Sequence, residues 1–383
     1  MVSVWIIAKG YAPDEGGLET YARAIANAYQ GLGLNVTVFT QTSVGPRTLL
    51  DQGVALIDVG PGSQLAIMLR LIRALQMERR RQGAPDLIHS VTWRTSLPAI
   101  LLGVGPIIIS VHGREINFAW GLLACAMKAA LKRAAAILTV SSATRDRLLL
   151  KVPTLNPVKV HVAWNGLSSW ASYREKKKHE SGESLRLLSV CRLVPRKNII
   201  GALRAAARAR SEGLSFSYDI GGRGPDLEQL KEIVSGEGLG ADVRLLGYVP
   251  DERVRQLYAE ADVFIHPQVE DACGKDFEGF GIAVADAMAA GAACVVGVAG
   301  GPSELIQDGV TGIVVDGNDS EAVFRALAYL LTNPDETYVI GQRAREFART
   351  HFSWTLHVQR ALAAVNLDLS GPAPTHGLGC PPS

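Results

Sequence analysis

Short apolar runs alternate with amphipathic segments along almost the whole chain, and this alternation restricts the fold more than any other feature. Each run is four to six residues long, which suits a buried strand, and the segments between them have the spacing of helices. Strands separated by helices form parallel sheets with right-handed crossovers. The pattern predicts strands at residues 4–8, 36–40, 87–90, 107–111 and 136–140, then at 185–190, 217–220, 243–246, 263–266 and 293–296.

The chain has 383 residues, more than one hydrophobic core usually supports. Its periodicity breaks at residues 167–184, where Ser, Lys, Glu and Gly predict a solvated linker. We therefore expect an α/β fold with two doubly wound, Rossmann-like domains, residues 1–166 and 185–352, facing each other across a cleft. A helix at residues 353–366 is expected to pack back on the first domain, and the Pro/Gly-rich tail at 370–383 is expected to be disordered.

The composition is that of a folded protein. Hydrophobic residues make up 48% of the sequence and charged residues 20%, and no apolar run is long enough to cross a bilayer. The first apolar run is too short for a secretory signal and leads directly into a Gly-rich turn. The five cysteines are scattered, without a Cys-x-x-Cys pair. We therefore expect reduced thiols and a cytoplasmic location.

Charge is distributed unevenly. Residues 1–165 hold 17 lysines and arginines against 9 acidic residues, whereas residues 166–383 hold 22 against 28. A basic front half is compatible with nucleic acid, phosphorylated ligands or an anionic membrane, and charge alone does not choose among them. Residues 65–81 interleave apolar residues with five arginines. This segment predicts either a helix that binds the cytoplasmic face of a membrane or an ordinary sheet-covering helix with a basic outer face.

Two loops carry candidate binding residues. Gly16 and Gly17 stand between the first predicted strand and the next helical pattern, where glycine lets the backbone approach an anion and free amides favour its charge. A glycine pair in such a turn can also serve only to close it. Arg192 and Lys197 follow the first strand of the second half, where they would clamp a diphosphate. The alternative is a solvated basic loop, because Arg196 lies beside them.

The segment at residues 278–304 is the most informative. Glu278 precedes a glycine turn, and the helical pattern that begins near Ile282 carries Asp286 within its first turns. Amides of Gly281 and Ile282 would point at a phosphate, flanked by carboxylates that accept hydrogen bonds from sugar hydroxyls. A helix with acidic residues near its start explains Asp286 but not the glycines. The segment therefore predicts a site for a nucleotide sugar.

This segment resembles the GT-B glycosyltransferases, and specifically the retaining family 4 type, also called glycosyl transferases group 1. Members of that family carry two glutamates separated by seven residues, in a pattern like Glu-Gly-Phe-Gly-Leu-Pro-x-x-Glu-Ala-Met-Ala-x-Gly. The resemblance extends over nearly the whole chain. Its further motifs are Gly16-Gly17-x-Glu19, Asp86-Leu-Ile-His89, Val111-His112, Ser141, Asn165-Gly166, Arg192 with Lys197, Gly222-x-Gly224-Pro225, Gly247-Tyr-Val, Ala261-Asp-Val-Phe, and Gly300-Gly301 with Glu304.

The resemblance implies four catalytic residues. His112 would contact the transferred sugar, and Glu278 would bind sugar hydroxyls. Arg192 and Lys197 would hold the charge of the donor diphosphate. His112 ends a predicted strand, where ligands bind in such sheets, whereas His89 is interpreted as a core histidine.

The resemblance also implies the donor-binding residues. Asp286 would take the ribose-binding role of the family's second acid. Aspartate is about one methylene shorter than glutamate, so we expect the ribose contact to need a small backbone shift or a water. The other donor-binding positions are Gly16, Gly17, Gly222, Gly224, Val249, Phe280, Gly281 and Ile282.

The implied activity is transfer of a hexosyl unit from GDP-mannose or a UDP-hexose to a hydroxyl of a lipid-linked or glycan acceptor, of the cell-envelope or exopolysaccharide type. The resemblance implies no nucleic-acid partner and no cofactor besides the substrate, and it leaves the oligomeric state open. No Asp-x-Asp occurs in the sequence, so we expect metal independence.

Other interpretations stay open. They are a sugar-nucleotide epimerase or a phosphorylase of the same fold, and a degenerate member that binds a nucleotide sugar without transferring it. The segment at residues 278–286 argues against the epimerase, and the absence of a recognisable context for a cofactor-bearing lysine argues against the phosphorylase. A dinucleotide oxidoreductase fits less well, because the first turn lacks the full Gly-x-Gly-x-x-Gly.

Overall fold

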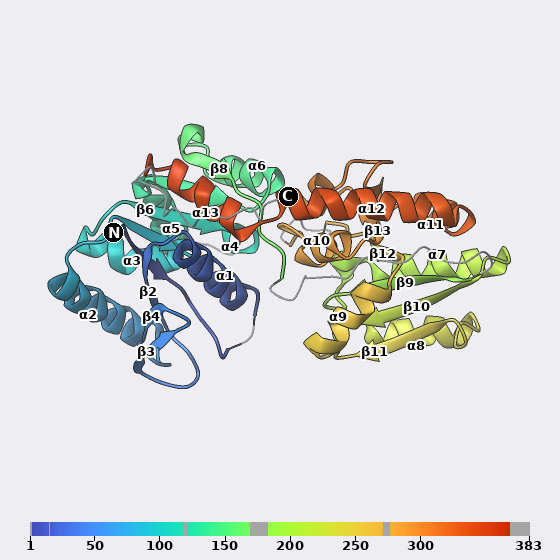
Figure 1. Cartoon of the computed structure of the whole chain (residues 1–383), viewed down its shortest axis with the longest axis horizontal. Helices are drawn as coiled ribbons and strands as arrows, with labels where there is room; N and C mark the ends of the chain where they lie inside the picture. Colours follow the sequence, from blue (N-terminus) through green and yellow to red (C-terminus); the bar gives the residue numbers. More distant parts are fainter. Residues whose placement is uncertain (1, 15, 118–120, 169–182, 271–275, 368–383) are drawn as a thin grey trace, which may run out of the picture.

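The computed structural model describes residues 2–14, 16–117, 121–168, 183–270 and 276–367. Two α/β domains lie side by side (Figure 1). The predicted tail and most of the predicted linker lie outside the described residues.

The N-terminal sheet has eight strands in the order β3-β4-β2-β1-β5-β6-β7-β8. They are β1 (Ser3–Ile7), β2 (Asn35–Thr40), β3 (Arg47–Asp51), β4 (Val54–Asp58), β5 (Leu87–Ser90), β6 (Ile107–Val111), β7 (Ala136–Thr139) and β8 (Val160–Val162). The helices of this domain are α1 (Gly17–Gly31), α2 (Gln64–Gln82), α3 (Trp93–Leu102), α4 (Arg114–Asn117), α5 (Gly121–Arg133) and α6 (Ser142–Lys151), and a short 3-10 helix, η1 (Pro157–Lys159), precedes β8.

Helices cover both faces of this sheet, which explains why its strands are apolar at successive positions. Along β1, Trp5 and Ile7 face the core beneath α2, α3 and α5, whereas Val4 and Ile6 face the core beneath α1. Side chains alternate between the two faces of a strand, so a strand covered on both sides has no polar face. The continuous apolar runs of the sequence have this origin.

The expectation of wholly parallel sheets is wrong at one edge. Strand β3 pairs antiparallel with β4. The connecting residues Gln52 and Gly53 both have positive φ, 50° and 88°, as a two-residue hairpin requires. A hairpin needs no crossover helix, so the alternation of strands with helices does not reveal it.

The C-terminal sheet has six parallel strands in the order β11-β10-β9-β12-β13-β14. They are β9 (Leu185–Val190), β10 (Phe216–Gly221), β11 (Val243–Gly247), β12 (Val263–His266), β13 (Ala293–Gly297) and β14 (Gly312–Val315). Its helices are α7 (Ile199–Ser211), α8 (Leu227–Gly236), α9 (Asp251–Glu260), α10 (Ile282–Ala289), α11 (Ser320–Thr332) and α12 (Pro334–His351), with two 3-10 helices, η2 (Pro195–Lys197) and η3 (Gly301–Leu305). All ten predicted strands are present within one residue of their predicted bounds, while β3, β4, β8 and β14 were not predicted.

After α12 the chain returns to the first domain. Helix α13 (Trp354–Ala363) packs against α1, and Val358 and Leu362 enter the core beneath α1 (Figure 1). Beside this return, Trp354 Nε1 donates a hydrogen bond of 2.8 Å to the carbonyl oxygen of Leu167. The two passages of the chain between the domains therefore contact each other. Within the described part of the chain, no helix has both the length and the apolar content needed to cross a bilayer.

In each sheet the strand order reverses beside the first strand. The reversal lies between β1 and β5 in one sheet and between β9 and β12 in the other. Ligands of open α/β sheets bind beyond the carboxyl ends of the strands at such points. The loop after β1 carries Gly16 and Gly17, and the loop after β9 carries Arg192 and Lys197.

Candidate active site

Glu278 is the centre of a buried group of charges. Its Oε2 accepts hydrogen bonds from Arg196 Nη1 and Lys197 Nζ, both on η2 directly after β9. Arg196 Nε lies 3.3 Å from Oδ2 of Asp276. Burial opposes ionisation of Glu278, but the cations of Lys197 and Arg196 outweigh it and hold the pKa of this carboxyl well below its usual range. Glu278 is therefore a carboxylate at every physiological pH.

His266 completes the surroundings of Lys197. It ends β12, on the other side of the strand reversal from η2, and its Nε2 lies 3.3 Å from Lys197 Nζ. Burial lowers the pKa of His266 to about 3, and the Lys197 charge acts in the same direction, so the imidazole is neutral. An ammonium group can only donate, so Nε2 accepts and Nδ1 carries the proton. Lys197 is thus held between a carboxylate and an imidazole.

Glycines bring the Glu278 loop against the N-terminal domain. A Cβ atom on Gly279 would lie 2.1 Å from the carbonyl oxygen of His112, so only glycine fits there. Gly281 has φ 91°, in the left-handed region, and lies against Pro302. Gly300 has φ 77° and faces the Glu278 carbonyl oxygen. The glycines of this motif therefore serve close backbone packing, which joins the candidate residues of the two domains.

Helix α10 begins without a side-chain cap. Gly281 is its N-cap residue. The amides of Ile282 and Ala283 have no hydrogen-bond partner among the described residues. Uncapped amides at a helix start favour a bound anion, which is the environment predicted from the sequence for a donor phosphate. Phe280, just before this start, is buried and packs edge-to-face on Phe352.

Asp286 lies in α10 and is buried. Its Oδ1 accepts a 3.0 Å hydrogen bond from the backbone N of Ser168, and its Oδ2 accepts a 2.6 Å bond from the Ser168 hydroxyl. Burial raises the pKa of Asp286 to about 6, although both bonds from Ser168 favour the charged form. Asp286, which the sequence predicts to bind the donor ribose, thus binds Ser168 in the segment that links the two domains.

His112 follows β6 and has one side-chain hydrogen bond, from Nε2 to the carbonyl oxygen of Val91 at 3.0 Å. A carbonyl only accepts, so Nε2 carries the proton. Burial lowers the pKa of His112, which keeps the ring neutral. Nδ1 is then an acceptor, with no hydrogen-bond partner within the described residues. His112 can therefore accept a hydrogen bond from a sugar hydroxyl.

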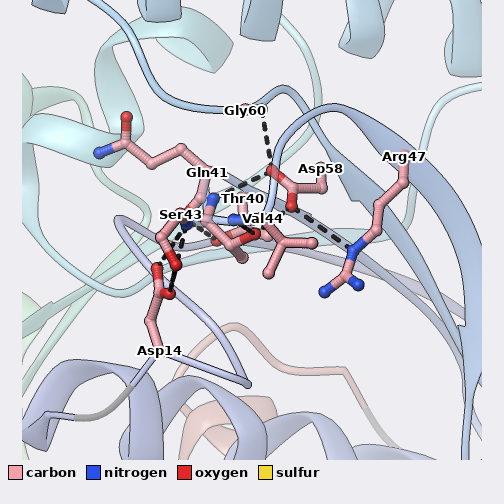
Figure 2. Close-up of polar contacts among 9 residues, drawn as sticks. Asp14, Thr40, Gln41, Ser43, Val44, Arg47, Asp58 and Gly60 are labelled. Carbon is pink, nitrogen blue, oxygen red and sulfur yellow. Dashed lines mark hydrogen bonds and ion pairs between the residues drawn. The ribbon is translucent and has the colours of Figure 1, made fainter.

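Two acidic side chains connect the loops that follow β1, β2 and β4 (Figure 2). Asp14 accepts hydrogen bonds from the backbone N of Ser43, at 2.9 Å, and from its hydroxyl. Asp58, at the end of β4, is buried and accepts from the backbone N of Thr42 at 3.0 Å. These bonds fix the Gly-rich loop relative to the carboxyl ends of β2 and β4.

The start of α1 faces a carboxylate of the chain itself. A Cβ atom on Gly16 would lie 2.2 Å from Glu19 Oε2, and one on Gly10 would lie 2.6 Å from Oε1. Glu19 is in the first turn of α1, where a negative charge interacts favourably with the helix dipole. A phosphate contacted by Gly16 and Gly17 would therefore lie near the Glu19 carboxylate. Phosphate binding by these two glycines remains a prediction.

The remaining predicted positions surround the end of β9. A Cβ atom on Gly222 would lie 1.8 Å from the Cys191 carbonyl oxygen, and one on Gly224 would lie 1.9 Å from that of Leu193. These two glycines allow backbones to pack. Val249 lies against Gly221. Arg192, the other cation predicted to bind the diphosphate, is exposed.

The sequence interpretation missed three residues of the charge group: Arg196, Asp276 and His266. The alternative of a solvated basic loop is wrong for Arg196, which is 8% exposed and paired with Glu278. Its only sequence signal was its position next to Lys197. His266 gave a clearer one, a polar residue at the end of an apolar strand.

Comparison with known proteins identifies the family. Residues 15–169 match the family model Glycosyltransferase Family 4, and residues 172–347 match Glycosyl transferases group 1. The fold and the matches define a glycosyltransferase with the GT-B fold. Within that class the chain belongs to the group 1, family 4 type.

Two relatives and two solved structures illustrate the similarity. The chain is 31% identical over 365 residues to the GDP-mannose-dependent alpha-(1-6)-phosphatidylinositol monomannoside mannosyltransferase of Mycolicibacterium smegmatis, covering 91% of this chain and 94% of the relative. It is 29% identical to alpha-maltose-1-phosphate synthase of the same organism, covering 78% and 84%. Sucrose-phosphate synthase from Thermosynechococcus elongatus superposes with a TM-score of 0.75 at 18% identity, covering 96% and 99%. HepE from Anabaena, in complex with UDP and glucose, gives 0.73 at 18% identity, covering 96% and 100%.

Proposed function

We propose that this glycosyltransferase moves a hexosyl unit from a nucleotide sugar to a hydroxyl group of a lipid-linked or glycan acceptor, with retention of anomeric configuration. GDP-mannose is the first candidate donor, because the mannosyltransferase relative spans nearly the whole chain. A UDP-hexose is the second candidate. The observation that carries the proposal is the Glu278 carboxylate, held by Arg196 and Lys197 beside the open start of α10 and the His112 loop.

The site suits recognition of a sugar diphosphate. Glu278 retains lone pairs that accept from sugar hydroxyls while two cations fix its orientation. Lys197 has three donors, so it can bridge Glu278 and a phosphate oxygen. Arg192 is exposed and has no ion-pair partner among the described residues, which leaves its guanidinium for the diphosphate.

Front-face displacement is the proposed mechanism. A carboxylate bound by two cations is a poor nucleophile, and Asp286 is bound by Ser168, so neither supports a covalent intermediate. The bond from the anomeric carbon to the phosphate oxygen breaks while the acceptor oxygen bonds on the same face, and the acceptor proton passes to the departing phosphate. Lys197, Arg192 and the α10 amides stabilise the charge that develops on that phosphate.

Metal independence is part of the proposal. The cations of the site and the α10 amides would meet the diphosphate charge in the place of a divalent ion. In the part of the chain that the structure describes, His, Cys, Asp and Glu side chains do not gather in threes at metal-ligand distances.

The donor is testable by thermal stabilisation with GDP-mannose, UDP-glucose and UDP-N-acetylglucosamine. A ligand present at 100 times its Kd stabilises the folded state by about 2.7 kcal/mol. We expect GDP-mannose to give the largest shift and to be hydrolysed or transferred with the α-anomer retained. Glu278→Gln should abolish turnover. Asp219→Asn is the matched control, because Asp219 on β10 is also paired with an arginine of this domain, Arg244 on the edge strand β11, whose side chain is 62% exposed.

Full activity of Glu278→Gln would contradict the assignment. Stabilisation by a donor without hydrolysis or transfer would favour a degenerate protein that only binds the nucleotide sugar. That alternative is suggested by Asp286, which stands where the family has glutamate, so Asp286→Glu would then be expected to restore turnover. An epimerised free nucleotide sugar as product would favour the epimerase.

We also propose that the acceptor is reached at an anionic membrane surface through α2, on the cytoplasmic face. Only Leu71, Leu75 and Glu78 of this helix are buried. Leu65 is 67% exposed and Met77 is 70% exposed. Arginines at positions 70, 73, 79, 80 and 81 are exposed on the same helix. A basic helix with outward apolar side chains is typical of interfacial binding.

The neighbouring helices extend this surface. Helix α3 packs between α2 and α5. Each neighbour has an outward leucine: Leu101 on α3 is 67% exposed and Leu122 on α5 is 89% exposed. In flotation with vesicles of anionic phospholipid, Leu65→Ser with Leu101→Ser should reduce binding, whereas Leu150→Ser on α6, which is 79% exposed, should not. No binding by the unaltered protein would refute the membrane proposal.

A further inference from the structure

A chain of buried hydrogen bonds crosses the N-terminal domain, and one of its members packs against the His112 ring. Tyr29 Oη lies 2.9 Å from His89 Nδ1, and His89 Nε2 lies 2.7 Å from Ser110 Oγ. Ser110 Oγ lies 2.7 Å from Tyr21 Oη, which lies 2.7 Å from His357 Nε2. All five side chains are at most 2% exposed. The chain therefore joins α1, β5 and β6 to the returning helix α13.

One fixed end decides the direction of every bond. His357 Nδ1 lies 3.0 Å from the carbonyl oxygen of Trp164, which can only accept, so Nδ1 carries the proton. Burial lowers the pKa of His357 to about 4, so the ring is neutral and Nε2 must accept from Tyr21. The Tyr21 oxygen is then left to accept from Ser110.

The same argument orders the far end. Ser110 donates to Tyr21 and therefore accepts from His89 Nε2. Burial keeps the pKa of His89 well below its usual range, so its Nδ1 accepts from Tyr29. The donors therefore run in one order, from Tyr29 through His89, Ser110 and Tyr21 to His357. Tyr21 Oη also lies 3.4 Å from His89 Nε2, a donor nitrogen in this order, so that contact fits it. The interpretation of His89 as a core histidine is confirmed by its full burial and by its hydrogen-bond contacts with Tyr29, Ser110 and Tyr21.

Tyr21 connects this chain to His112. The Tyr21 ring meets the His112 ring edge-on, with centroids 4.6 Å apart and an interplanar angle of 83°. On other sides Tyr21 contacts Trp354 and His357, with centroid distances of 5.5 and 5.3 Å. Both of those residues belong to α13. The ring that supports His112 is therefore itself held by the returning helix.

We propose that Tyr21 and His357 are positioning residues for His112, and that docking of α13 on the first domain sets the orientation of this histidine. The proposal rests on the proposed function, because it takes His112 to contact the transferred sugar. The Tyr21 hydroxyl holds the ring in place, the ring restricts the imidazole, and the imidazole keeps Nε2 on Val91 and Nδ1 available to substrate. Neither positioning residue needs to touch the substrate.

Tyr21→Phe tests this directly, and Tyr29→Phe is its matched control. Both variants remove one buried hydroxyl from the same chain, but only Tyr21 contacts His112. We expect Tyr21→Phe to lower kcat about tenfold with little change in donor Kd, since misorientation of a catalytic group by a fraction of an ångström has effects of this order. Tyr29→Phe should lower stability comparably and leave kcat within about twofold.

A double-mutant cycle separates positioning from general destabilisation. In the background of His112→Ala, Tyr21→Phe should have no further effect on kcat, because the group through which it acts is gone. Additive losses would overturn the proposal. His357→Leu should reproduce the loss of kcat seen in Tyr21→Phe. His357→Gln should keep part of the activity, because the glutamine amide both accepts and donates hydrogen bonds.

Ring nitrogen chemical shifts of His112 give a readout that does not need activity. We expect the Nε2–H tautomer in the unaltered protein and a mixture of tautomers in Tyr21→Phe, with Tyr29→Phe unchanged. Identical His112 spectra in all three proteins would refute the positioning role, whatever the enzyme transfers. An unaltered protein that shows the expected spectra but turns over no nucleotide sugar would instead refute the proposed function.

Discussion

Replacing Asp286 with asparagine should make the protein more stable at high pH and remove a pH dependence. Burial raises the pKa of Asp286 from its ordinary value of 3.8 to about 6. Asparagine cannot ionise, but it keeps the hydrogen bonds: its oxygen accepts from the Ser168 backbone N, and its amide donates to the Ser168 hydroxyl. The exchange therefore changes the charge with little change in packing.

The sign and size follow from the two pKa values. The folded protein holds a proton on Asp286 more tightly than the unfolded chain does, so this group lowers stability as the pH rises from about 4 to above 6. A shift of about two units is worth about 3 kcal/mol in total. Between pH 4.5 and pH 8 the variant should gain about 2 kcal/mol over the unaltered protein, since part of the titration lies below pH 4.5.

Equilibrium urea unfolding at the two pH values, followed by tryptophan fluorescence, measures this gain. The difference between variant and unaltered protein cancels the titration of all other groups. Ser168→Ala is a second control, because it removes a hydrogen bond to the Asp286 carboxylate. Alone, it should steepen the pH dependence of the unfolding free energy. In the double variant with Asp286→Asn, it should have no effect on that pH dependence. A difference that is flat from pH 4.5 to pH 8, or that falls, would show that the Asp286 carboxyl is not destabilised by burial.

Three further predictions concern the site. Lys197→Ala should lower kcat by roughly a hundredfold or more and donor affinity far less, because a charge that meets the leaving phosphate acts mainly in the transition state; single-turnover rates and donor titration measure the two, and an unchanged rate constant would sink the assignment. Chelator should leave turnover unchanged, and loss of activity that manganese or magnesium restores would contradict metal independence. Glu304 accepts from the backbone N of Ser142 at 2.8 Å and of Ala143 at 2.6 Å, across the domain boundary at the start of α6. Glu304→Ala should therefore loosen the domains, seen as a larger radius of gyration in solution scattering, whereas Glu304→Gln should keep much of the contact.

Much of the architecture follows from local sequence. A strand covered on both faces must be apolar along its length, and this property located ten of the fourteen described strands within one residue. The β3–β4 hairpin was not predicted because β3 is an edge strand with two exposed residues and no buried one, and an exposed edge strand need not be apolar. The Glu278 motif was visible for a similar local reason: its glycines and acids are adjacent in sequence.

The sequence by itself thus determined two α/β domains, the strand positions and the motif that marks the family. Only the tertiary structure decided which charges meet there. Arg196 looks like a surface residue until the reversal of strand order between β9 and β12 brings η2 against the Glu278 loop, and burial then makes its pairing necessary. Likewise, Tyr21 and His357 are 336 positions apart, and they bond because α13 returns to the first domain. Local periodicity records which face of an element is buried, whereas the partner across that face depends on how the chain returns.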